Sequence, residues 1–409
     1  MSTTGPISKL AQGPLPDELR EPLEQLLAQG LGDLSLRQLL GMTLSGLAAA
    51  ERSAYLEKTP QDKGNGSYQR SLGIGSLSVP IEVPRTRSGC FRPALLPAAY
   101  QRVYPDEMQQ LLLALLCSSR SLNAAKAALK KLGLPCSEDD LEAVAGEYLE
   151  QFALLNSRPL DPDLIALFID GKYVEVKDSE HIRPTTIYVA VGLTRCGHKR
   201  VLACMVRPGR ENLEDWKRLL RSLIERGLRR LLILVQDDFS GLLALTKGLF
   251  AHSDIQLCIV HMQRNAKHHL PKADAAEFQE RLRMIKNSYS AERAAGDFEE
   301  LCQRFESAAP AFIAELRKKR DHYLRFLDYP LPLRRAFSTT NAVEAVNGQL
   351  ERLRLNNGGY FQSETNLQLK LGIATRFLQD GKWRSPAAAV REVLPQLNAI
   401  FERRFEALP

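Results

Sequence analysis

The sequence predicts an α/β protein that has an RNase H-like core with an all-helical insertion, preceded by mainly helical N-terminal regions with a small β element. Two observations carry this prediction. From residue 159 onward, three strand-like runs with short connections are followed by the order helix, strand, helix, strand, which matches an RNase H-like core. A charged and almost wholly helical stretch then follows, and it is too long for a simple connection.

Length and composition set the broad class of the protein. A chain of 409 residues is expected to form about two to four domains. A content of 44% hydrophobic and 25% charged residues is typical of a soluble globular protein. The net charge of +7 favours a polyanionic partner, although only mildly. The seven cysteines are scattered and form no Cys-x-x-Cys pair, which favours reduced thiols over a disulfide framework.

Targeting and membrane segments are not expected. The N-terminus, MSTTGPISKLAQGP, lacks the charged start and apolar core of a secretory signal. The longest apolar runs, LLLALLC and LLILV, are far shorter than a bilayer span. We therefore expect a cytoplasmic protein without a membrane partner.

The first 158 residues are predicted to form three regions. Residues 1–63 contain helical spacing in LPDELREPLEQLLAQG and in SLRQLLGMTLSGLAAAERSAYLEK. Residues 64–104 form a small, basic, β-rich element, because Gly, Ser and Pro punctuate short alternating runs such as SLSVPIEV. Residues 105–158 are helical and include a helix-turn-helix pattern in which Gly133 ends one helix and Ser137 caps the next. That pattern fits either a DNA-binding motif or a plain helical hairpin.

Residues 159–409 are predicted to form the catalytic domain. LIALFIDGKYVEV is a strand, TTIYVAVGLTRCGHKRVLACMV is a hairpin that turns at CGHK, and ENLEDWKRLLRSLIERG is an amphipathic helix. LRRLLILVQDD is a buried strand, SGLLALTKGLFAHS a helix, and IQLCIVH a further strand. The helical insertion covers about residues 263–332, and helices resume at TTNAVEAVNGQLERLRL.

Two acids are predicted to stand at strand ends. Asp170 closes LFID and Asp237 closes LLILVQD, and these strands are neighbours in an RNase H-like sheet. Glu344 follows on a helix after the insertion. Two-metal phosphoryl transfer needs such a cluster, because carboxylates hold hard divalent cations that activate the attacking oxygen and stabilise the leaving one. The three acids are therefore candidate metal ligands and catalytic residues.

Simpler interpretations of the same acids remain open. An Asp before Gly, as at Asp170, is an ordinary turn signal. Glu344 stands three residues after Asn341, which fits a capping box. The polar stripe on this helix also fits a solvated face. Its members are Glu344, Asn347, Glu351 and Arg354.

The segment QLCIVHMQRNAKHHL raises the question of a zinc site, because it contains Cys258, His261, His268 and His269. Structural zinc needs about four ligands, usually as two pairs, and no second pair stands nearby. We instead expect a strand that delivers His261 to the carboxylates, where imidazole can donate a hydrogen bond to the scissile phosphate or orient a ligand. A satisfied core histidine is the alternative, and Cys258 is expected to pack in the sheet.

Several segments together resemble the Mutator-type transposases of bacterial insertion sequences, a branch of the DDE transposases. LFIDGKYVEV resembles the first-aspartate strand of that family and VQDDFSGL resembles its second-aspartate segment. QLCIVHMQRN resembles its Cys-x-x-His segment, and STTNAVEAVNGQLERLR resembles its glutamate helix. EVPRTRSGCFRPALLP and the late GKW extend the likeness to about residues 65–400.

The resemblance implies an enzyme that cuts the terminal inverted repeats of its element and joins their 3′-OH ends to new DNA. Its catalytic acids would be Asp170, Asp237 and Glu344, although Asp238 stands where the family usually has Gly. Two Mg²⁺ or Mn²⁺ ions and a homodimer or higher assembly on DNA are implied, as is a place at the bacterial nucleoid. The alternatives are a non-catalytic, domesticated DNA-binding protein and an RNase H-like nuclease or resolvase.

Basic residues agree with a double-stranded DNA partner, since Lys and Arg neutralise phosphates. Three arginines of the β-rich element lie in a segment punctuated by Pro and Gly, and three lysines lie on the first helix of the helix-turn-helix pattern. The residues expected to contact DNA are Arg70, Arg85, Arg87, Arg92, Lys126, Lys130, Lys131, Arg264 and Arg354.

Overall fold

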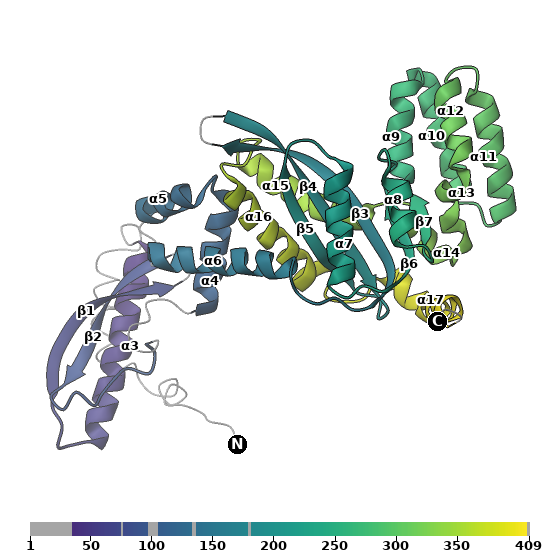
Figure 1. The fold of residues 1–409 in the computed structure, drawn as a ribbon. Coiled ribbons are helices and arrows are strands. Elements are labelled where there is room, and N and C mark those ends of the chain that lie inside the picture. The colour runs from purple at the N-terminus through teal and green to yellow at the C-terminus, as the bar shows by residue number, and fades with distance from the viewer. Residues whose placement is uncertain (1–34, 75–76, 97–104, 133–135, 179–180, 407–409) are drawn as a thin grey trace. The chain divides into compact units, whose positions relative to one another are not determined.

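The structure is a computed structural model, and it describes residues 35–74, 77–96, 105–132, 136–178 and 181–406 (Figure 1). The predicted helix LPDELREPLEQLLAQG and the cap at Gly133 lie outside the described residues. The chain divides into two compact units, residues 1–145 and 146–409. The four regions expected from the sequence, residues 1–63, 64–104, 105–158 and 159–409, stay a prediction. The boundary between the two units, after residue 145, coincides with none of theirs.

In the first unit, helix α3 (Leu36–Lys58) packs on a hairpin of β1 (Gly64–Ile74) and β2 (Leu77–Thr86). The helix begins at a capping box in which Ser35 and Gln38 bond each other's backbone N–H. The hairpin contributes buried residues such as Val79 and Ile81 to a small core. A Cβ on Gly41 would lie 2.5 Å from the Pro80 carbonyl oxygen, so this glycine allows the helix to approach the strand.

Three helices follow the hairpin: α4 (Pro105–Ser118), α5 (Leu122–Leu132) and α6 (Glu138–Leu155). Helices α5 and α6 confirm the two helices of the predicted helix-turn-helix pattern. Ser137 caps α6 as expected, because its hydroxyl accepts from the Asp140 N–H at 3.1 Å and the Asp140 carboxylate accepts from the Ser137 N–H at 2.8 Å.

The second unit is built on a mixed five-stranded sheet with the order β5-β4-β3-β6-β7. Strands β3 (Asp163–Asp178), β4 (His181–Thr194) and β5 (Lys199–Pro208) are antiparallel. Strands β6 (Arg230–Gln236) and β7 (Asp254–Leu257) run parallel to β3 and to each other. Helices α7 (Leu213–Glu225) and α8 (Leu242–Leu249) provide the crossover connections. The predicted order of strands and helices and the α/β class are confirmed.

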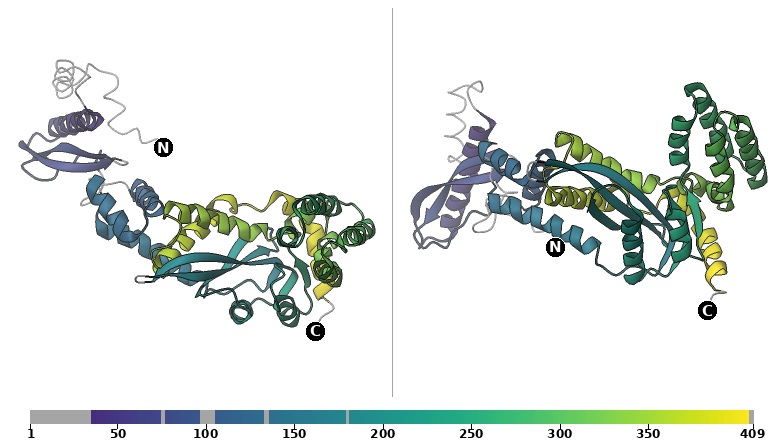
Figure 2. Two further views of the ribbon diagram at one scale, coloured as in Figure 1. Left: turned by 90° about the horizontal axis from the view of Figure 1, so that it is seen from above. Right: turned by 45° about the horizontal axis from the view of Figure 1, so that its top comes forward.

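Helices cover both faces of this sheet (Figure 2). Each face has its own hydrophobic core, because side chains alternate along each strand. On one face, Leu167 and Leu234 pack with Trp216 of α7. On the other face, Phe168 and Val235 belong to the core formed with the helices that follow β7. From Ala166 onward, odd-numbered residues of β3 therefore face α7 and even-numbered ones face those later helices, and the irregularity between Leu164 and Ala166 reverses this order before it.

Two strand ends differ from the prediction. Strand β3 does not end at Asp170 but continues to Asp178, because β4 pairs with it over this length after the pairing with β6 has ended at Phe168. Strand β7 ends at Leu257, so CIVH is not part of a strand. Its last pair with β6 joins Leu257 to Gln236, the end of β6. Helix α9 (Ile259–His269) begins directly after β7, with Cys258 as its N-cap.

The stretch expected as a helical insertion is helical from α9 to α14, and its first four helices gather beside one another (Figure 1). Its further elements are α10 (Lys272–Lys286), α11 (Ala291–Phe305), α12 (Pro310–Lys318), α13 (Arg320–Tyr323), η1 (Arg325–Asp328) and α14 (Leu331–Phe337). The C-terminal elements are α15 (Asn341–Asn356), α16 (Glu364–Phe377), the π-helical η2 (Leu378–Lys382) and α17 (Ala388–Phe405). Within the described residues, no helix has the length and apolar character needed to cross a membrane.

Candidate active site

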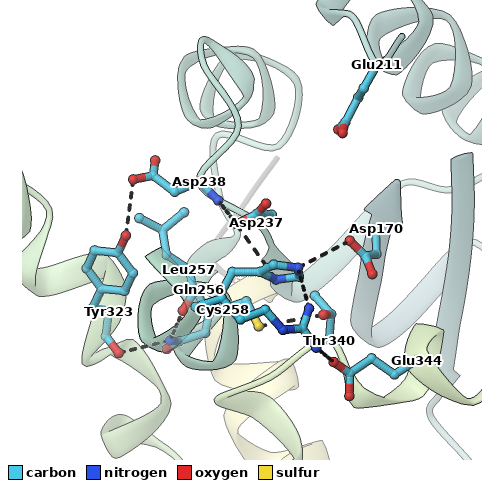
Figure 3. Close-up of polar contacts among 12 residues, drawn as sticks. Asp170, Glu211, Asp237, Asp238, Gln256, Leu257, Cys258, Tyr323, Thr340 and Glu344 are labelled. Carbon is cyan, nitrogen blue, oxygen red and sulfur yellow. Dashed lines mark hydrogen bonds and ion pairs between the residues drawn. The ribbon is translucent and has the colours of Figure 1, made fainter. Parts of the chain in front are cut away.

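The three predicted acids come from different elements; Asp170 and Asp237 lie beside His261, and Glu344 is bound by Arg264. Figure 3 shows the site with the acids labelled. Asp170 stands on β3, two residues beyond the last pair with β6, and only 8% of it is exposed. Asp237 directly follows β6, and Glu344 lies in the first turn of α15. Asp170 therefore lies beyond the part of β3 that pairs with β6, and Asp237 lies just after the end of β6.

His261 and Arg264, one turn apart on α9, link the acids. The His261 ring lies 3.9 Å from Asp170 through Nε2 and 3.8 Å from Asp237 through Nδ1. Arg264 places Nη1 3.2 Å from His261 Nε2, and its Nη2 donates to Glu344 Oε1 at 3.1 Å. Sequence reasoning placed His261 near the carboxylates, but through a strand, whereas the structure delivers it from the first turn of a helix.

The site carries excess negative charge. Burial raises the pKa of Asp170 to about 7 against the opposing effect of His261, and the carboxylates of Asp237, Glu211 and Glu344 add to the rise. Burial opposes protonation of His261, but Cys258, Asp237 and Asp170 together raise its pKa to about 9. A charged His261 therefore offsets part of the repulsion among the acids.

Cys258 and the histidines that follow it in the sequence have different surroundings. Cys258 is buried, its Sγ lies 3.6 Å from Thr340 Oγ1, and the effect of His261 lowers the thiol pKa despite burial. His268 is exposed, and His269 stacks on Phe312 at 4.9 Å. No three Asp, Glu, His or Cys side chains in the described part of the chain converge as a metal-binding group. His261 and Arg264 lie between the acids in this arrangement.

Asp238 is turned away from the other acids. Lys319 Nζ donates to both of its carboxylate oxygens at 2.8 and 2.9 Å, and the Tyr323 hydroxyl donates to Oδ2 at 3.1 Å. The Asp238 carboxylate is thus engaged by the helical insertion, whereas Asp237 faces His261. These contacts favour Asp237 over Asp238 as the second acid of the site.

The polar stripe of α15 faces β3 and is not a solvated face. Asn347 Nδ2 donates to Asp170 Oδ2 at 3.3 Å, and Glu351 pairs with Lys172 at 3.1 Å. Arg354 donates to Glu351 and to the Gly359 carbonyl, so its charge has internal partners. The capping-box interpretation of Glu344 is wrong, because α15 begins with Thr340 as the N-cap and without a side-chain cap bond.

The predicted DNA-contacting residues of the first unit differ in their environment. On the hairpin, Arg85 lies over the Tyr68 ring at 5.4 Å. Arg87, Arg92 and Lys131 are exposed, and Arg70 is half-buried.

The other two lysines of α5 have acidic partners on α6. Lys126 pairs with Glu142 and with Glu138, the latter at 3.7 Å, and Lys130 pairs with Glu138 at 2.6 Å. Part of the positive charge expected to meet DNA is therefore balanced within this unit.

Glu211, in the loop between β5 and α7, is a residue of the site that sequence reasoning missed. It raises the pKa of Asp170, and its own pKa is raised by burial and by Asp237, against the effect of a Trp216 hydrogen bond. The available signal was an acid directly before a helix cap, after the third core strand. It is the ordinary sign of a helix start, so it did not mark a site.

Comparison with known proteins identifies relatives over most of the chain. Residues 20–383 match the family described as Transposase, Mutator family. The transposase for insertion sequence element ISRM3 of Rhizobium meliloti (strain 1021) is 29% identical over 354 residues, 86% of this chain and 87% of that protein. The probable transposase for insertion sequence element ISRM3-like of Sinorhizobium fredii (strain NBRC 101917 / NGR234) is 29% identical over 395 residues, 94% and 96% of the two chains.

The Drosophila P element transposase strand transfer complex, a solved structure, matches 72% of this chain and 84% of its own at 14% identity. Its TM-score of 0.27 is too low to bear on the fold. Fold and site together define a mixed α/β protein with an acidic, histidine-containing centre. The chain belongs to the Mutator family of transposases, and it is a DNA transposase of the type found in bacterial insertion sequences.

Proposed function

We propose that this transposase binds the terminal inverted repeats of its element and catalyses metal-dependent cleavage and strand transfer in an RNase H-like core. The observation that carries the proposal is the gathering of Asp170, Asp237 and Glu344 around His261 and Arg264, from elements widely separated in the sequence. The sheet order, with two parallel strands added beside an antiparallel meander, supports the RNase H-like assignment.

The donor set suits a hard divalent cation. Carboxylate oxygens are preferred ligands of Mg²⁺ and Mn²⁺. Asn347 places a buried amide oxygen, Oδ1, beside Asp170, and this atom lacks a hydrogen-bond partner among the described residues. Asp170, Asp237 and Glu344 would hold two such cations, which would activate the attacking oxygen and stabilise the leaving one.

The two α9 residues have separate roles in this proposal. His261 is held between Asp170 and Asp237, where a charged imidazole donates a hydrogen bond toward a phosphate oxygen. Arg264 holds Glu344, and its side chain is 56% exposed. We expect Arg264 to release Glu344 to the cation and to contact a DNA phosphate instead.

The DNA substrate and the assembly complete the proposal. Double-stranded terminal repeats and target DNA are the expected partners, with recognition in the first unit. A homodimer or higher assembly would hold two element ends, and the protein would act at the bacterial nucleoid.

The test is incubation of the purified protein with flanking DNA that carries both terminal repeats, with and without Mg²⁺. We expect nicking at the 3′ ends and joining of those ends to target DNA, only with the cation. Cleavage without joining would point to a nuclease or resolvase, and binding without cleavage to a non-catalytic DNA-binding protein.

A further inference from the structure

Glu211 approaches the acidic site from the face of the sheet that α7 covers. A Cβ built on Gly171 would lie 2.9 Å from Glu211 Cδ and 3.0 Å from each carboxylate oxygen. Along β3, Asp170 faces α15 and Gly171 faces the opposite side. Because Gly171 has no side chain, the Glu211 carboxylate lies directly on the strand beside the aspartate.

The position of Glu211 is fixed by buried groups. Trp216 Nε1 donates to Glu211 Oε1 at 2.7 Å, and Trp216 is 1% exposed and packs edge-on against Tyr188 at 4.9 Å. The Tyr188 hydroxyl accepts from the Asn212 N–H at 3.0 Å, and the Asn212 side chain caps α7 by accepting from the Asp215 N–H. The loop is therefore held on both sides of the carboxylate.

The surroundings of Glu211 are acidic. Figure 3 shows its side chain directed toward the acids of the site. Within the described residues, no ion pair joins Glu211 to a Lys or Arg. His261 is the cationic group whose charge acts on Glu211. A partly buried carboxylate among several others is unfavourable unless a further cation balances it.

We propose that Glu211 is a fourth carboxylate of the active site and provides, with Asp170 and Asp237, an oxygen ligand for the divalent cations. This inference rests on the proposed function. Four carboxylates carry four negative charges, which equal the positive charge of two divalent cations, whereas three leave an excess of positive charge. Gly171 is required beside Asp170 because any side chain there would displace this ligand.

The first test is titration of the metal-free, full-length protein with Mn²⁺ by calorimetry. Glu211→Gln retains the acceptor oxygen for Trp216 and removes only the charge. Glu214→Gln is the matched control, because this neighbour is 70% exposed and pairs only loosely with Lys217 at 3.7 Å. We expect Glu211→Gln to weaken Mn²⁺ binding about tenfold or more and Glu214→Gln to leave it unchanged. Wild-type Mn²⁺ affinity in Glu211→Gln overturns the proposal.

The second test uses the contact between Glu211 and Gly171. Gly171→Ala should weaken Mn²⁺ binding in the wild type, because the added Cβ displaces the carboxylate. In a Glu211→Ala background the same change should have no further effect on Mn²⁺ affinity, since nothing is left to displace. Thermal melting checks that each variant is folded. Equal losses in both backgrounds would show that Gly171 acts independently of Glu211, against the proposal.

Two further variants separate this inference from the proposed function. Asp170→Asn and Asp237→Asn are expected to weaken Mn²⁺ binding at least as much as Glu211→Gln. If both weaken it and Glu211→Gln does not, Glu211 is no ligand and the proposed function stands. If neither weakens it, the metal site of the proposed function is itself wrong.

Discussion

The two units differ in how charged residues are used. In residues 146–409, acids of β3, of the loop after β6 and of α15 lie around His261 and Arg264. In residues 1–145, two of the lysines expected to contact DNA are instead paired with acids of the next helix. A buried acid has few environments that it tolerates, whereas a surface lysine finds partners within its own unit at little free-energy cost. Charge alone therefore predicts a site better in a core than on a surface.

The largest expected effect concerns the acids of the second unit. Asp170→Asn, Asp237→Asn and Glu344→Gln each remove a ligand charge without adding bulk. Changes outside the ligand shell of metal sites already cost about 10–100-fold, so we expect losses above about 100-fold in DNA cleavage. Binding of terminal repeats should remain. Gel assays of nicked and joined products measure both, and a variant that cleaves at the wild-type rate removes that residue from the site.

His261→Gln should lower cleavage by about 10–100-fold, because the imidazole lies between two carboxylates of the site and contacts Arg264. Wild-type protein should contain no stoichiometric zinc. Elemental analysis is the check: one equivalent of zinc per chain, lost in Cys258→Ser, would make QLCIVHMQRNAKHHL a metal site instead.

Asp170→Asn should also raise the stability of the metal-free protein at pH 8. The folded-state pKa of about 7 lies above the ordinary 3.8, so the folded state binds more protons between these values and its stability falls as pH rises through them. The full difference corresponds to about 4 kcal/mol, and we expect roughly 1–2 kcal/mol because the buried Asn amide carries a desolvation cost of its own.

Urea unfolding at pH 4 and pH 8 measures this effect on stability. The gain from Asp170→Asn should appear at pH 8 and vanish near pH 4, and Glu214→Gln, on an exposed residue, should show no such gain. A variant that is less stable than wild type at pH 8 would contradict the expected burial cost.

The order of strands and helices could be predicted because hydrophobic periodicity is a local signal, and two of the predicted acids, Asp170 and Asp237, lie beside His261. Prediction from the sequence failed where tertiary contacts decide. Strand β3 passes Asp170 because β4 extends it, and Cys258 begins a helix because β6 has ended. Glu211 was missed because its role depends on Gly171 and Trp216, which only the fold brings to it.

Asp238 tests whether the helical insertion stabilises the site. Asp238→Gly leaves the half-buried Lys319 without its main partner, so we expect a loss of about 1–2 kcal/mol in unfolding free energy with cleavage retained within about tenfold. Lys319→Met should lower the unfolding free energy by about 1 kcal/mol less in the Asp238→Gly background than in the wild type. Strictly additive losses would show that the pair does not couple, and complete loss of cleavage would make Asp238 the second ligand.

The smallest expected effect returns to the basic residues of the first unit. A double change of Arg85 and Arg87 to Gln removes exposed charges, whereas a double change of Lys126 and Lys130 to Gln removes charges that already pair with α6. Each lost phosphate contact lowers the salt dependence of binding by about 0.9 in log–log slope. We expect a fall of about 2 for the arginine variant and below about 1 for the lysine variant, by fluorescence anisotropy of the full-length protein with terminal-repeat DNA. Equal falls per residue would show that DNA opens the lysine pairs, and the contrast between paired and exposed charge would then not govern recognition.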